Sequence, residues 1–159
     1  MPIAVYPGTF DPITNGHSDL IERATLIFDK VIVGVAASPS KRPRFSLQQR
    51  VGLAHRVLDG LERVEIREFD ILLVEFTRQC SADVILRGLR AVSDFEFEFQ
   101  LAHMNRRLNP EIETVFMMTG EDHFYVSSNM VREVASFGGK VTGLVPEHVE
   151  RRLAERFGK

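Results

Sequence analysis

With 159 residues, the chain is long enough to form one compact domain, which would bury about 70% of the surface that its unfolded form exposes. Its 20 Lys and Arg residues nearly balance 22 Asp and Glu residues, so the chain lacks the overall basic field that is typical of nucleic-acid-binding proteins. The single cysteine, Cys80, excludes an internal disulfide and a cysteine-based zinc cluster, and it suits a reducing compartment.

The N-terminal segment does not have the pattern of a secretory signal. Pro7, Gly8 and Asp11 interrupt it, and no basic segment precedes a long apolar run. No apolar stretch approaches the length that is needed to cross a membrane. We therefore expect a cytoplasmic protein that binds neither nucleic acid nor membranes.

Short apolar runs alternate with helical patterns along the chain. The runs cover residues 3–6, 31–36, 64–66, 83–86 and 114–118. Strands that alternate with helices favour a parallel sheet that is covered on both faces. The predicted fold class is therefore α/β, with a Rossmann-like, doubly wound parallel sheet of five strands and helices on both faces. No repeat, low-complexity tract or linker divides the chain.

Capping residues mark the starts of two helices in the middle of the chain. Ser46 and Gln49 have the spacing of a capping box, which predicts a helix that ends at about Leu58. Ser93 and Glu96 have the same spacing and offer a second box. Both helices are predicted to follow strands of the sheet.

Two more helices are predicted near the C-terminus. Residues 127–129 can cap the first of them, and the pair Gly138 and Gly139 is expected to end it. Pro146 lies where the first turn of the last helix, over residues 148–157, would begin.

The segment over residues 95–99 has two possible periodicities. Phe95, Phe97 and Phe99 alternate with glutamates as in a half-buried strand, but the capping box before them and the apolar spacing after them favour a helix over 94–108. On such a helix some of the phenylalanines would remain uncovered. Because exposed apolar patches usually mark association, we predict a subunit interface there.

The loop over residues 8–17 joins the first strand to a helix over about 20–28. The N-terminus of a helix offers free N–H groups and a partial positive charge, so an anion beside Thr9, Asn15 and His17 would meet several donors. A nucleotide phosphate suits this position. Taken alone, the loop could instead be a glycine-shaped turn in which His17 only caps the helix.

Phosphate-seeking residues follow three of the predicted strands. Thr9 and His17 follow the first strand, residues 38–42 (SPSKR) follow the second, and residues 87–90 (RGLR) follow the fourth. Ligands of open parallel sheets bind beyond the carboxyl ends of the strands, so these loops should meet at one edge. Arginine and lysine there could hold a polyphosphate and a second phosphorylated substrate, as phosphoryl or nucleotidyl transfer requires.

Two common nucleotide-binding signatures are absent from the sequence. It has no Gly-x-x-x-x-Gly-Lys-Ser/Thr loop, and the first loop has no Gly-x-Gly-x-x-Gly. Residues 14–17 (TNGH), together with residues 126–132 (VSSNMVR), instead resemble the Thr/His-x-Gly-His nucleotidyltransferase superfamily. Members of that superfamily transfer nucleotidyl groups without a covalent enzyme intermediate.

Three longer segments, 6–17, 37–41 and 87–96, are similar to those of the bacterial phosphopantetheine adenylyltransferases. The resemblance covers essentially the whole chain, and its motifs have the order and spacing of that family. It implies one nucleotidyltransferase domain over residues 1–159 that converts ATP and 4'-phosphopantetheine to dephospho-coenzyme A and pyrophosphate, with magnesium. This is the penultimate step of coenzyme A biosynthesis. The resemblance also implies a homohexamer that coenzyme A can inhibit by feedback.

The resemblance also implies roles for individual residues. His17, Lys41 and Arg90 are expected to be catalytic, with His17 stabilising the transition state, and no residue is expected to bind a metal. The expected contacts of the acceptor substrate are Thr9, Lys41, Leu73 and Arg87. The expected contacts of ATP are Thr9, Phe10, His17, Gly88, Leu89, Arg90, Glu98, His123, Phe124, Tyr125, Val126, Ser127, Ser128 and Asn129.

Two features depart from the pattern of the family. Asn129 stands where many members carry a third hydroxyl residue, although asparagine can still cap a helix and donate. The loop over residues 119–125 is more acidic than a polyphosphate site suggests, and it lacks the tryptophan of some members.

Two alternative functions fit the same residues. The first is a related nucleotidyltransferase with a different phosphorylated acceptor, and the second is a non-catalytic regulator that binds a nucleotide. The stretch 87–98 argues against the first, and the joint presence of Thr9, His17, Lys41 and Arg87 argues against the second. His55, His103 and His148 have no partners at ligand spacing and are expected to be structural.

Overall fold

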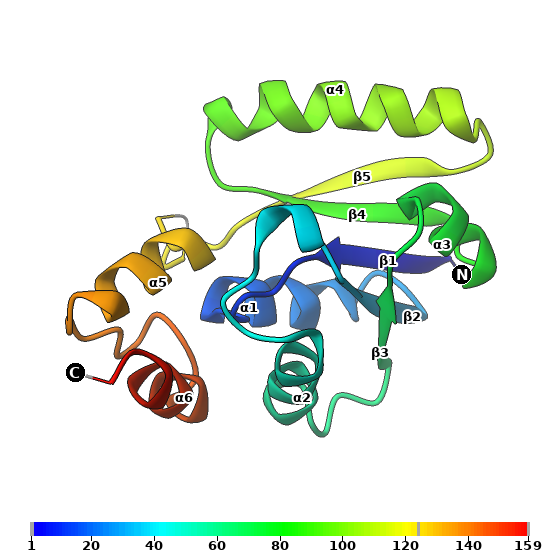
Figure 1. Ribbon diagram of the computed structural model, residues 1–159. Coiled ribbons are helices and arrows are strands. Elements are labelled where there is room, and N and C mark those ends of the chain that lie inside the picture. Colours follow the sequence, from blue (N-terminus) through cyan, green and yellow to red (C-terminus); the bar gives the residue numbers. More distant parts are fainter. Residues whose placement is uncertain (1, 124, 159) are drawn as a thin grey trace.

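The computed structural model describes residues 2–123 and 125–158 (Figure 1). Strands and helices alternate along most of this part of the chain. The elements are β1 (Ile3–Gly8), α1 (Asn15–Ala24), β2 (Lys30–Ala36), the 3₁₀ turn η1 (Pro39–Lys41), α2 (Leu47–Val57), β3 (Val64–Phe69), α3 (Leu73–Gln79), β4 (Val84–Leu89), α4 (Val92–Leu108), β5 (Glu113–Met118), α5 (Ser128–Ser136) and α6 (Glu147–Phe157). None of these helices combines the length and the apolar character that crossing a membrane requires.

The strands form one parallel five-stranded sheet in the order β3-β2-β1-β4-β5. The chain first builds outward from β1 through β2 to β3, and then returns to add β4 on the other side of β1. The loops that follow β1 and β4 therefore leave the same sheet edge in opposite directions, and ligands of doubly wound sheets bind in the crevice at such a point. The predicted Rossmann-like α/β fold is confirmed.

Both faces of the sheet carry buried apolar side chains. On one face, β1, β2 and β4 pack against α1, α2, α5 and α6, through residues such as Leu20, Leu53, Val131 and Leu153. On the other face, Phe76 and Cys80 of the α3 region pack on Val5 and Ile32, and α4 lies across β4 and β5 (Figure 1). Because each central strand is buried on both faces, its sequence is a continuous apolar run.

The capping box at Ser46 is confirmed, whereas the box predicted at Ser93 is wrong. Helix α4 begins earlier, at Val92, and no side chain caps its first turn from Ala91. The third helical residue, Asp94, instead accepts a hydrogen bond from the N–H of Arg90. The carboxylate of Asp94 thus binds a backbone N–H that precedes the helix. Ser93 is the second residue of the helix and lies inside its first turn.

Helix α4 resolves the two periodicities of residues 95–99 in favour of a helix. Phe95, Phe97 and Phe99 are 45%, 64% and 48% exposed, so all three lie partly or largely in solvent. Their uncovered state agrees with the pattern that led us to predict a subunit interface. The interface itself stays a prediction.

The predicted ends of the last two helices agree with the structure. Ser127 caps α5 by accepting a hydrogen bond from the N–H of Met130. The chain leaves α5 through Gly138, whose φ of 79° is one that glycine adopts without strain. Pro146 occupies the N-cap position of α6.

Candidate active site

The loops after β1 and β4 surround a pocket of about 280 Å³ at the carboxyl ends of these strands. Three further segments complete its wall: the start of α1, the turn η1 and the start of α5. The predicted site residues that line the pocket are Thr9, His17, Lys41, Arg87, Gly88, Arg90, Val126, Ser127 and Ser128. The three phosphate-seeking loops therefore meet in one place, as the sequence predicts.

His17 lies in the first turn of α1, in a reciprocal cap with Thr14. The Thr14 hydroxyl accepts a hydrogen bond from the His17 backbone N–H, and the Thr14 backbone N–H donates to Nδ1 of the imidazole over 3.0 Å. A backbone N–H can only donate, so Nδ1 is an acceptor and the ring hydrogen of the neutral imidazole is on Nε2. His17 therefore offers an Nε2–H donor to the pocket.

The imidazole of His17 is supported by an aromatic neighbour. The ring of buried Phe10 meets it edge to face, with 4.9 Å between ring centroids, and Phe10 in turn contacts Tyr6 at 5.5 Å. These contacts fix the plane of the imidazole before any ligand binds. Phe10 itself lies beneath His17 and does not line the pocket.

The electrostatic surroundings keep His17 neutral. Burial, together with the positive charge of Arg90, lowers the pKa of His17 to about 4. Burial likewise raises the pKa of Tyr6 to about 12, so the phenol in the wall of the pocket is also neutral. At neutral pH both side chains act through hydrogen bonds and carry no charge.

We expect the imidazole of His17 in the ligand-free protein to titrate near pH 4, and not near the ordinary value of 6.5. Because the folded state resists protonation, stability should fall as pH decreases from 6.5 to about 4, by about 3 kcal/mol from this group. NMR titration of the ring and denaturant unfolding of wild type and His17→Gln would measure both effects. A ring midpoint near 6.5, or an equal pH dependence in His17→Gln, would contradict the expectation.

Two helix N-termini lie in the wall of the pocket. Gly16 and His17 of α1 and Ser127 and Ser128 of α5 all lie in its wall. The hydroxyl of Ser128 donates to the carbonyl of Pro12 over 2.7 Å, which fixes the start of α5 against the first loop. Partial positive charges from both helices therefore act on an anion in the pocket.

The three cations of the pocket differ in how firmly they are held. Arg87 makes a two-pronged ion pair with Glu98 of α4, at 2.6 and 2.7 Å. Although burial opposes its charge, this carboxylate raises the pKa of Arg87. Arg90 contacts Asp94 at 3.2 Å and is more exposed. Lys41 is exposed, and no carboxylate among the described residues pairs with it.

The other predicted ligand residues do not line this pocket. Glu98 lies behind Arg87, Asn129 faces a neighbouring hollow, and Leu73 begins α3, where it packs against the apolar cores. Of the stretch 123–129, only Val126, Ser127 and Ser128 are in its wall; His123 packs against Gly16, and Phe124 lies outside the described residues. Leu89 and Tyr125 also lie outside the pocket wall.

The sequence analysis missed two residues that build the site. Arg50 of α2 is 2% exposed and donates hydrogen bonds to the carbonyls of Phe45, Thr9, Ala36 and Ala37. It thereby fixes the ends of β1 and β2 relative to each other. The only signal in the sequence is a cation on the apolar side of a helix, between Leu47 and Leu53.

Asp11 is the second missed residue. Its buried carboxylate accepts hydrogen bonds from the backbone N–H groups of Arg44 and Phe45, at 2.8 and 2.9 Å, and lies 3.5 Å from Arg132. One side chain thus connects the first loop to the segment after η1 and to α5. The wall of the pocket is assembled from segments far apart in the chain.

Comparison with known proteins agrees with this geometry. The model of the cytidylyltransferase-like family matches residues 5–134. The chain is 60% identical over 157 residues to a phosphopantetheine adenylyltransferase of Alkalilimnicola ehrlichii, with 98% of this chain and 90% of that protein covered. It is 59% identical over 156 residues to a protein of the same name from Thioalkalivibrio sulfidiphilus, with 98% of each covered. The chain therefore belongs to the cytidylyltransferase-like nucleotidyltransferases and, among them, to the phosphopantetheine adenylyltransferase family.

Proposed function

We propose that this chain transfers the adenylyl group of ATP to 4'-phosphopantetheine, which gives dephospho-coenzyme A and pyrophosphate, the penultimate step of coenzyme A biosynthesis. The observation that carries the proposal is the pocket between β1 and β4, where the Nε2–H of His17 lies among three cations and two helix N-termini. The names of two relatives at 59–60% identity support the choice of acceptor.

The reaction forms one phosphorus–oxygen bond and breaks another. An oxygen of the acceptor's phosphate attacks the α-phosphorus of ATP, and the bond to the pyrophosphate oxygen breaks. The attacking oxygen is already anionic, so no general base is required. Negative charge accumulates on the nonbridging α-oxygens and on the leaving pyrophosphate, and fixed donors beside these atoms lower the barrier.

The residues of the pocket match this demand. We assign the Nε2–H of His17 to a nonbridging oxygen in the transition state, because its tautomer and ring plane are set before the substrates arrive. Lys41 and Arg90 supply charge to the phosphates, and Arg87 holds the phosphate of the acceptor. The N–H groups at the start of α5 bind the phosphates of ATP.

We propose that magnesium enters as the MgATP complex. No group of three or more His, Cys, Asp or Glu side chains within residues 2–123 and 125–158 is placed to hold a metal ion. The carboxylates of Asp94 and Glu98, which lie next to two arginines of the pocket, are already paired with Arg90 and Arg87. The phosphate oxygens of ATP and water would therefore supply most ligands of the ion.

We expect Glu98→Ala to raise KM for 4'-phosphopantetheine about tenfold and to leave KM for ATP nearly unchanged. The resemblance placed Glu98 among the ATP contacts, but its carboxylate lies behind Arg87 and orients that guanidinium. Steady-state kinetics with each substrate varied in turn would measure the two constants. Glu96→Ala is a matched control, because Glu96 is an exposed glutamate of the same helix. A selective rise in KM for ATP would instead support the contact that the resemblance implies.

The proposed function is tested by pyrophosphate release from MgATP, with and without 4'-phosphopantetheine. Release that depends on this acceptor supports the proposal. Release only with another phosphorylated acceptor, such as nicotinate mononucleotide or glycerol phosphate, would show a related transferase. Tight binding of ATP without release to any acceptor would show a nucleotide-binding regulator.

We propose further that the protein is a cytoplasmic homohexamer and that coenzyme A inhibits it by feedback. The exposed phenylalanines of α4 support an assembly, because a monomer seldom leaves so many neighbouring aromatic side chains in solvent. Light scattering at micromolar concentration that gave the mass of a single chain would contradict the assembly. Inhibition by coenzyme A would be read from the same pyrophosphate assay.

A further inference from the structure

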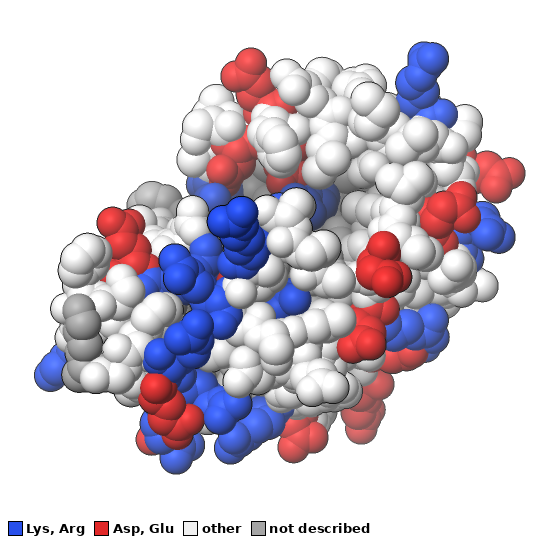
Figure 2. All heavy atoms as spheres, in the orientation of Figure 1, with Lys and Arg blue, Asp and Glu red and all other residues white. Residues whose placement is uncertain are grey.

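The pocket at the ends of β1 and β4 is called the reaction pocket below. A second hollow, of about 810 Å³, lies beside it. Three parts of the chain form its walls: η1 and the segment that follows it, the exposed side of α5, and the end of α6. Its polar lining is Lys41, Arg42, Arg44, Asn129, Arg132, Glu133 and Ser136. Figure 2 shows Lys and Arg gathered in a stripe on this face of the molecule, between η1 and α6.

Three of the four cations of this hollow have no ion-pair partner among the described residues. The lining holds four cations and one carboxylate, although the chain as a whole has a net charge of −2. Lys41, Arg42 and Arg44 take part in none of the ion pairs among the described residues. Three neighbouring cations without carboxylate partners repel one another, and a polyanion bound between them would relieve that repulsion.

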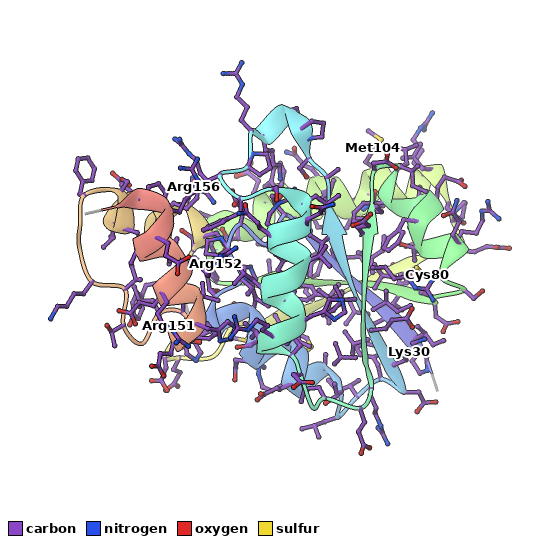
Figure 3. All side chains as sticks on the ribbon, turned by 60° about the horizontal axis from the view of Figure 1, so that its bottom comes forward. Lys30, Cys80, Met104, Arg151, Arg152 and Arg156 are labelled. Atoms are coloured by element: carbon purple, nitrogen blue, oxygen red, sulfur yellow. The ribbon has the colours of Figure 1, made fainter. Side chains whose placement is uncertain are left out.

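Side-chain hydrogen bonds fix the backbone at Arg44, which carries one of these cations. Asp11 accepts a hydrogen bond from the N–H of Arg44 over 2.8 Å, and Arg156 of α6 donates to the carbonyl of Arg44 over 3.2 Å. Figure 3 shows Arg151, Arg152 and Arg156 along α6, with Arg156 at the end of that helix. Arg132 donates to the carbonyl of Asp11. The backbone at Arg44 and the side chain of Arg132 are therefore held in place by bonds within the protein.

The backbone of the turn itself is in a costly conformation. Ser38 and Arg42, which flank η1, have φ values of 47° and 48°, in the left-handed region that non-glycine residues seldom occupy. Such strain persists where the surroundings fix it, and it is concentrated at ligand-binding segments. Here it places Lys41 between the two hollows, since Lys41 lines both.

We propose that this hollow is a second binding site, specific for a linear polyphosphate, which receives the pyrophosphate that leaves the reaction pocket or holds the triphosphate of a second nucleotide. The proposal rests on the proposed function for the identity of the leaving group. Lys41 would contact the phosphates in either hollow, and Arg42 and Arg44 would bind only in the second one. Guanidinium groups suit this ligand because each can bind two phosphate oxygens at once.

The test is calorimetric titration of inorganic pyrophosphate into protein whose reaction pocket is already filled with magnesium α,β-methylene-ATP. We expect one further equivalent to bind to wild type, with an affinity at least tenfold lower in the double variant R42Q/R44Q. R107Q, which removes one exposed cation from the end of α4 on the other side of the sheet, is the control and should bind as wild type does.

Each result decides the point. If wild type binds a single equivalent of the analogue, failure of pyrophosphate to bind to that complex, or equal pyrophosphate affinity in R42Q/R44Q and R107Q, would overturn the second site. If the protein binds one equivalent of the nucleotide analogue and then pyrophosphate, the hollow is a product site. If it binds two equivalents of the analogue, the hollow is a nucleotide site. Failure of the analogue to bind at all would contradict the proposed function, but a loss of pyrophosphate affinity in R42Q/R44Q would still support the second site.

Discussion

Replacement of His17 by alanine is expected to lower kcat by about 100- to 1,000-fold, with a change in KM for ATP of no more than about threefold. The Nε2–H donor is fixed by the bond from the Thr14 N–H to Nδ1, so it costs no reorganisation when charge develops on the α-phosphate. In the ground state this charge is smaller and the cations and helix N-termini share it. The loss should therefore fall mainly on the transition state.

Single-turnover and steady-state assays of pyrophosphate release would separate these contributions. His55→Ala is the matched control, because His55 is an exposed histidine of α2 that takes no part in the pocket. Parallel losses of ATP affinity, with kcat nearly unchanged, would assign His17 to ground-state binding. A wild-type kcat that rises as the pH is lowered toward 4, with no such rise in His17→Ala, would show that a charged imidazole is the active form.

The sequence alone predicted the layers of the fold because the relevant signals are local. Each strand is an apolar run, since helices cover both faces of the sheet, and Ser46 with Gln49 forms the expected capping box. The start of α4 was misplaced because several residues there can serve as caps. Which one does depends on the contact between Asp94 and Arg90, and spacing does not determine that choice.

The site was predictable to the extent that parallel strands deliver their following loops to one edge. This rule alone brings Thr9, Lys41 and Arg87 together. The residues that hold the loops in place were not predictable. The bond from Arg50 to the carbonyl of Thr9 joins residues 41 positions apart, and a side chain that bonds to backbone carbonyls leaves no complementary residue type in the sequence.

The ion pair between Arg87 and Glu98 could not be predicted from the sequence either. Glu98 follows Arg87 by 11 positions, on a different element, and its burial depends on how α4 crosses β4. A motif comparison assigns both residues to ligands, whereas the structure joins them to each other. The distinction matters, because a carboxylate that orients an arginine affects one substrate and a carboxylate that binds ATP affects the other.

Arg50→Met is expected to lower the free energy of unfolding by at least about 3 kcal/mol, a large loss for a single substitution. The guanidinium satisfies three carbonyls at the ends of β1 and β2 and that of Phe45 before α2, and its removal leaves these buried or part-buried acceptors without this donor. Burial lowers the pKa of Arg50, but the carboxylate of Asp11 opposes that effect and the guanidinium stays charged. The charge is therefore held by carbonyl dipoles together with one nearby carboxylate.

Urea unfolding at neutral pH would measure this effect, with Arg56→Met as the control, because Arg56 is an exposed arginine on the same helix. Arg50→Lys separates charge from shape: an ammonium keeps the charge but has only three donors, which cannot reach all four carbonyls. We expect Arg50→Lys to fold, to be less stable than wild type, and to bind both substrates more weakly, because the first loop and η1 lose their common support. Equal unfolding midpoints for Arg50→Met and Arg56→Met would show that water replaces the guanidinium without cost. The bonds from Asp11 to the N–H groups of Arg44 and Phe45 would then be sufficient to join the first loop to the segment after η1.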